Sequence, residues 1–161
     1  MNTSRTMIMS GLLVIAAAAS AAAQTATQTV TLQVDAINQV AVTGTPSLTI
    51  TAAVAGGAPT SVTSSGNTWA VTTNQTNAKI TASIGSAMPT GVTLSANLGS
   101  PAGGTSAGLQ ALGTTAVDMV TGITKLNASG LSLSYQLDAT SAAGVISSTT
   151  RVVTYTITGG V

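Results

Sequence analysis

The side chains that could carry out chemistry are few and lie far apart along the chain. From residue 24 onward the titratable side chains are Asp35, Lys79, Asp118, Lys125, Tyr135, Asp138, Arg151 and Tyr155. The chain has no His and no Cys, so a zinc site would lack imidazole and thiolate ligands and a serine nucleophile would lack its usual base. Three scattered Asp residues predict neither a glycosidase carboxylate pair nor a calcium loop. We therefore expect a protein that is not an enzyme, with no catalytic residues, no metal site and no cofactor.

The charge balance argues against nucleic acid as a partner. From residue 24 onward the chain has three basic and three acidic side chains, and the whole chain is 4% charged. Binding to phosphates needs clustered Lys and Arg, usually with aromatic side chains on which bases stack. One Trp and two Tyr are present, so we expect no binding of nucleic acid.

The N-terminus has the pattern of an export signal. Arg5 precedes an apolar run over residues 7–19, and small residues then offer a cleavage site before Gln24. A membrane anchor is the alternative, but the run is shorter than the roughly 20 apolar residues that a spanning helix needs. We expect residues 1–23 to be a cleaved signal peptide and residues 24–161 to be one secreted domain, extracellular or at the cell surface, with no membrane attachment after cleavage.

The rest of the chain alternates apolar and polar residues between turn signals, which is typical of half-buried strands. With 44% hydrophobic residues and little charge, its composition is opposite to that of disordered chains. We predict an all-β fold, a single antiparallel β-sandwich of immunoglobulin or pilin type with about eight to ten short strands. A tight turn is expected at 64–67 and a long Gly-rich connection at 99–115. The expected strands are 28–36, 38–44, 47–54, 60–64, 68–73, 78–84, 92–98, 116–123, 130–139 and 150–160.

The first of these segments, residues 28–36, is the main candidate for function. Val30, Leu32, Val34 and Ala36 lie on one face of an extended chain, and polar residues lie on the other. One interpretation is an ordinary edge strand of the sandwich. The other is a donor strand that is added to a neighbouring copy, where its backbone gives affinity and its alternate side chains fill pockets.

Two other features have a structural and a functional interpretation. Trp69, the only Trp, predicts a residue packed in the core; alternatively, with Asn67 and nearby amides, it forms a contact surface for a sugar ligand. The last strand predicts a central core strand in which Tyr155 packs and finds a hydrogen bond for its hydroxyl. An assembly signal at the C-terminus is the alternative.

The layout resembles that of secreted bacterial fimbrial subunits with a β-sandwich fold. The resemblance rests on an early "TVTLQV", a mid-chain "GVTLSANL" and a closing "LSLSYQLDAT" followed by "RVVTYTIT". It implies pilin-like proteins that polymerise by donating a strand. Chaperone–usher pilins typically carry a disulfide and a Tyr just before the C-terminus. This chain has no Cys, and Tyr155 lies six residues from its end.

The edges of the expected sheets have few of the Lys, Pro and bulge features that normally prevent pairing between proteins. We therefore predict a structural subunit of an extracellular filament, pilus or surface matrix that self-assembles by β-strand complementation. Its partners would be other copies of itself, with other surface proteins or glycans as further candidates. The alternative is a monomeric secreted binding module for carbohydrate or surface adhesion.

Overall fold

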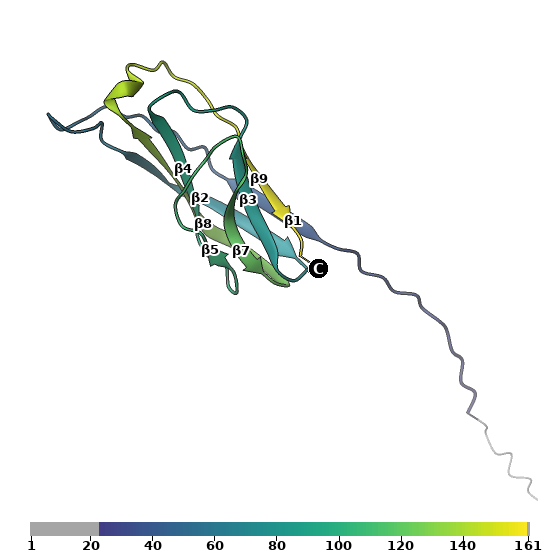
Figure 1. The fold of residues 1–161 in the computed structure, drawn as a ribbon. Helices are drawn as coiled ribbons and strands as arrows, with labels where there is room; N and C mark the ends of the chain where they lie inside the picture. Colours follow the sequence, from purple (N-terminus) through teal and green to yellow (C-terminus); the bar gives the residue numbers. More distant parts are fainter. Residues whose placement is uncertain (1–22, 161) are drawn as a thin grey trace, which may run out of the picture. The chain divides into compact units, whose positions relative to one another are not determined.

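A computed structural model describes residues 23–160, which contain nine strands in two antiparallel sheets packed as a sandwich (Figure 1). The predicted fold class is confirmed. The five-stranded sheet has the order β1-β2-β8-β4-β6, and the four-stranded sheet has the order β5-β7-β3-β9. The strands are β1 (Asn38–Thr43), β2 (Val62–Thr73), β3 (Ala78–Ile84), β4 (Val92–Leu98), β5 (Thr105–Ser106), β6 (Gln110–Ala111), β7 (Val117–Ile123), β8 (Leu126–Ala139) and β9 (Val153–Thr158). A 3-10 turn, η1, spans Ser141–Ala143.

The expected signal peptide, residues 1–23, lies outside the described residues except for its last position. The chain consists of two units with their boundary between Gln33 and Val34, and all nine strands belong to the second unit. Residues 23–33 form no strand or helix.

The core forms where the apolar faces of the two sheets meet. In β3 the alternation places Ala78, Ile80, Ala82 and Ile84 inside, each at most 3% exposed. This is the face that period-two alternation predicts for a half-buried strand. The largest fully buried side chains come from both sheets; they are Trp69, Ile80, Leu98, Met119, Val120 and Ile123.

Residues 62–73 form one continuous strand, although two strands and a turn were expected there. The pairing of β2 with β8 shifts register between Ser64 and Asn67, and Gly66 between them has a φ of 84°. The segment "SSGN" is therefore a bulge within the strand and not a turn, since an extra residue can be absorbed at a left-handed Gly without ending the ladder.

Three further expectations were wrong. Residues 47–54 form no strand, and their only ladder contact is an isolated bridge between Ala53 and Pro59. The Gly-rich connection 99–115 contains the short strands β5 and β6. The last strand, β9, is not central, because it pairs with β3 alone and ends the four-stranded sheet.

Candidate strand-assembly site

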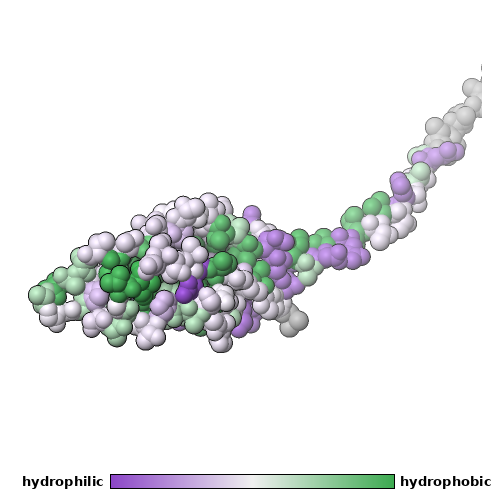
Figure 2. All heavy atoms as spheres, turned by 90° about the horizontal axis from the view of Figure 1, so that it is seen from above, coloured by the Kyte–Doolittle hydropathy of each residue, from purple (hydrophilic) through white to green (hydrophobic). Residues whose placement is uncertain are grey.

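The segment with the predicted donor residues, 28–36, forms no strand and belongs to neither sheet; we call it the arm. Val30, Leu32 and Val34 are 67%, 86% and 80% exposed, and Ala36 is exposed as well. In Figure 2 apolar and hydrophilic groups follow one another along the arm. A single exposed Leu is ordinary in a soluble protein, but three exposed large apolar side chains within residues 30–34 are not. The structure does not support the interpretation of this segment as an edge strand, because residues 28–36 pair with neither sheet.

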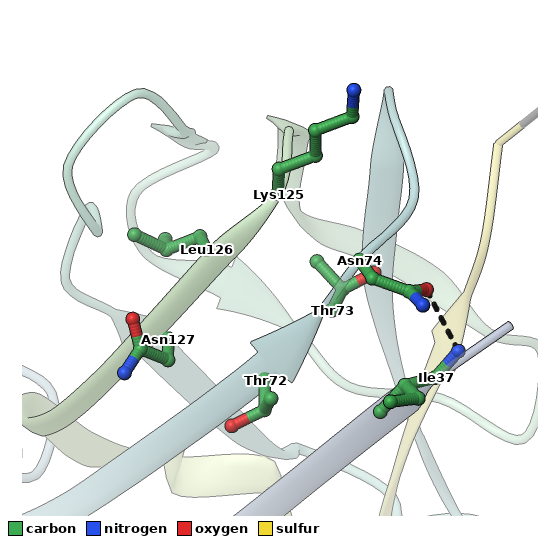
Figure 3. A pocket seen from close by; sticks show the side chains of 7 residues that line it. All are labelled: Ile37, Thr72, Thr73, Asn74, Lys125, Leu126 and Asn127. Carbon is green, nitrogen blue, oxygen red and sulfur yellow. Dashed lines mark hydrogen bonds between the residues drawn. The ribbon is translucent and has the colours of Figure 1, made fainter. Parts of the chain in front are cut away.

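The chain enters β1 through a small hydrogen-bonded clamp centred on Asn74 (Figure 3). The Asn74 Oδ1 accepts from the Ile37 N–H at 2.8 Å, and its Nδ2 donates to the Asp35 carbonyl at 2.7 Å. The Asn74 backbone N–H donates to the Ile37 carbonyl at 3.2 Å. These three bonds fix the point where the arm ends and the sandwich begins. Ile37 also lines a shallow pocket of about 300 Å³ beside Leu126.

A cleft of about 960 Å³ opens into the sandwich near the connections β1–β2 and β8–β9. Leu94 and Leu137 of the five-stranded sheet line one side, and Val153 of β9 lines another. Leu48 and Ile50, which are half-buried, line it from the β1–β2 connection. Protein interiors are normally packed with few voids larger than a water molecule. A cleft of this volume is large enough to accommodate several further side chains.

The cleft exists because the chain leaves the five-stranded sheet at Gly44. This residue has a φ of 123°, and a Cβ there would overlap the Asn67 side chain. β1 pairs with residues 68–73 of β2, and residues 44–51 form no strand that would continue alongside 62–67. The alternation of residues 47–54 predicts one apolar face with Leu48, Ile50, Ala52 and Val54, and only part of this is correct: Leu48 and Ile50 are half-buried in the cleft, whereas Ala52 and Val54 are exposed. Gly44 and Pro46 were the signals that this segment departs from the sheet.

Two tyrosines join the sheets within the cleft. The Tyr155 hydroxyl on β9 donates to the Tyr135 hydroxyl on β8 at 3.0 Å, and both residues line the cleft. Burial raises the pKa of Tyr155 above its ordinary value of about 10, and the hydrogen bond with Tyr135 raises it further. The expectation that Tyr155 packs and hydrogen-bonds is confirmed. The sequence did not predict Tyr135 as its partner. Alternation predicts on which face of its strand each Tyr lies, but not which strands of the two sheets lie opposite each other.

Arg151 holds the segment before β9 in place. Its Nε and Nη2 donate to the Ala87 carbonyl at 3.2 and 3.1 Å, and its Nη1 donates to the Thr150 carbonyl at 2.8 Å. The guanidinium thereby ties the β8–β9 connection to the β3–β4 connection at the border of the cleft. Sequence reasoning gave Arg151 no role.

The predicted ligand contacts Trp69 and Asn67 lie inside the sandwich. Trp69 is 1% exposed and Asn67 is 6% exposed. Asn67 donates from its Nδ2 to the Ser64 Oγ at 3.3 Å. The indole face of Trp69 is not accessible for stacking on a sugar, so the core interpretation is the one that its burial supports.

Lys79 and Asp118 form an exposed ion pair at 2.9 Å, of a kind that contributes little to stability. Within residues 23–160 no group of three or more His, Cys, Asp or Glu side chains could hold a metal ion. In the same range no helix is long and apolar enough to cross a membrane.

Comparison of the chain with protein-family models, with curated proteins and with solved structures finds no match.

Proposed function

We propose that this protein is an exported structural subunit of an extracellular filament, pilus or surface matrix, in which copies join by β-strand complementation. The arm of one copy is the donated strand, and Val30, Leu32, Val34 and Ala36 are the side chains that the next copy buries. The fimbrial resemblance of the sequence layout agrees with this role.

The observation that carries the proposal is the exposure of the arm. Its three large apolar side chains are between 67% and 86% exposed in a segment that belongs to neither sheet. Burying a Val or Leu side chain stabilises a protein or a complex by roughly 1.5–3 kcal/mol. The described subunit does not gain this stabilisation from the arm, because the three side chains are exposed. An extended segment with alternate apolar residues is suited to adding to a sheet edge.

Deletion of Gln24–Ala36 tests the proposal. The intact protein without its signal peptide should form fibres visible by electron microscopy. The arm-deleted protein should remain a folded monomer by circular dichroism and sedimentation, and should bind a synthetic peptide of residues 28–36. An intact protein that stays monomeric at high concentration, or an arm-deleted protein that forms the same fibres, contradicts the proposal.

The alternative of a monomeric carbohydrate-binding module has lost its main support, since Trp69 is buried. A glycan array probed with the intact protein would still detect such binding.

A further inference from the structure

The four sheet edges differ in what they can offer an incoming strand. The five-stranded sheet ends in β1 and β6, and the four-stranded sheet ends in β5 and β9. β5 and β6 have two residues each, whereas β1 and β9 have six. Very short edge strands present too few backbone groups to template pairing. Among the described strands, β1 and β9 are therefore the edges long enough to accept the arm.

The cleft distinguishes β9 from β1. Val153 and Tyr155, two of the three inward positions of β9, line the cleft, and β1 contributes only Val42 at its end. The exposed positions of β9 between them are all Thr. Residues 153–158 contain no Lys and no Pro, two of the features that usually prevent an edge from pairing. β1 approaches β9 without hydrogen-bonding to it, and a Cβ at Gly159 would meet the Asn38 side chain of β1, so a further strand has room only at the Val153 end of β9, beside the cleft.

We propose that β9 and the cleft beside it accept the arm of a second copy, which joins the four-stranded sheet as a fifth strand next to β9. This inference rests on the proposed function and names the acceptor for it. Leu32 and Val34 enter the cleft above the Tyr135–Tyr155 pair, and the polar residues of the arm face solvent.

β9 is long enough for the apolar positions of the arm. A strand rises about 3.3 Å per residue, so Val30 to Val34 needs about 13 Å of edge, which the six residues of β9 provide. Both segments have the same period of two, so each inward side chain of the arm lies beside an inward side chain of β9. The cleft volume of about 960 Å³ leaves room for the arm's side chains without unfolding of the sandwich.

Disulfide trapping tests the acceptor, because the chain has no Cys to interfere. Residues on neighbouring strands have Cα atoms about 4.5–5.5 Å apart, which a disulfide can bridge. Three variants of the protein without its signal peptide are prepared: Val30→Cys, Leu32→Cys and Val34→Cys. The arm can pair with β9 in more than one register, and the three positions allow one of the cysteines to lie opposite residue 153. Each is mixed under mild oxidation with a tagged copy that carries Val153→Cys.

The matched controls are tagged Thr154→Cys, on the same strand but the opposite face, and tagged Val42→Cys, on β1. At least one arm variant should give a tagged heterodimer with Val153→Cys at a tenfold higher yield than with Thr154→Cys. Equal yields at the two β9 positions, or a preference for Val42→Cys, would overturn the assignment of the acceptor.

Amide hydrogen exchange gives a second reading that needs no substitution in β9. Adding the peptide of residues 28–36 to the arm-deleted protein should slow exchange across residues 153–157, and protection confined to β1 would overturn the acceptor. The two proposals fail separately: fibres that require the arm but are not linked through β9 leave the proposed function standing, whereas fibres that form without the arm remove both.

Discussion

Truncating one side chain of the arm provides a quantitative test of strand complementation. Leu32 is 86% exposed in the subunit, so Leu32→Ala should not change the stability of the subunit itself. If the next copy buries this side chain, the substitution removes three carbons from the contact, at about 0.8 kcal/mol each. Multiplied by the exposed fraction of Leu32, the loss of binding free energy is about 2 kcal/mol, so the arm should bind the next copy with an affinity roughly thirtyfold lower.

Fluorescence anisotropy measures this loss directly. Labelled peptides of residues 28–36 are titrated with the arm-deleted protein, and the Leu32→Ala peptide is compared with the original sequence. The matched control is Thr31→Ala, which changes the neighbouring position on the polar face and should alter the dissociation constant less than threefold. Equal effects of the two substitutions would refute the reasoning, because strand addition requires the two faces to differ.

The remaining predictions concern the sandwich. Gly44→Ala should lower the free energy of unfolding by about 1–3 kcal/mol, because the added Cβ would overlap the buried Asn67 side chain. The control is Gly85→Ala, where the structure leaves open space, and chemical denaturation should show no comparable loss for it. Trp69→Ala should cost about 3–5 kcal/mol and Trp69→Phe clearly less, because the indole Nε1–H has no hydrogen-bond partner within the described residues; equal losses in thermal denaturation would contradict this. Because burial raises the pKa of Tyr155, the folded state holds its proton more tightly than the unfolded state, so stability should fall as the pH rises above about 10. Tyr155→Phe should flatten that alkaline slope, and an unchanged slope would assign it to other groups.

Alternation in the sequence predicted the inner faces of the sandwich well. Trp69, Val71 and Thr73 of β2 were expected on one face, and all three are buried. The same holds for the inward residues of β3. These predictions succeed because burial of one face imposes the period of two on any strand, whichever strand it pairs with.

Pairing itself could not be read from the same pattern. Residues 47–54 alternate as well as any strand, yet they follow a turn at Gly44 that carries them away from β2. Residues 64–67 look like a turn, yet the ladder between β2 and β8 continues through them as a bulge. A strand depends on the backbone groups beside it, and those are set by distant segments that the local pattern does not contain. The cleft and the Tyr135–Tyr155 pair were missed for this reason.

The energetics of joining two copies indicate why a long acceptor edge matters. Burial of Val30, Leu32 and Val34 contributes roughly 1.5–3 kcal/mol for each side chain. Association costs an estimated 4–15 kcal/mol in lost translational and rotational freedom, so the side chains alone do little more than offset it. The surplus must come from backbone hydrogen bonds, which contribute about 0.5–1.5 kcal/mol each. A two-residue edge such as β5 or β6 cannot supply enough of them, whereas the six residues of β9 can form a ladder along most of the arm.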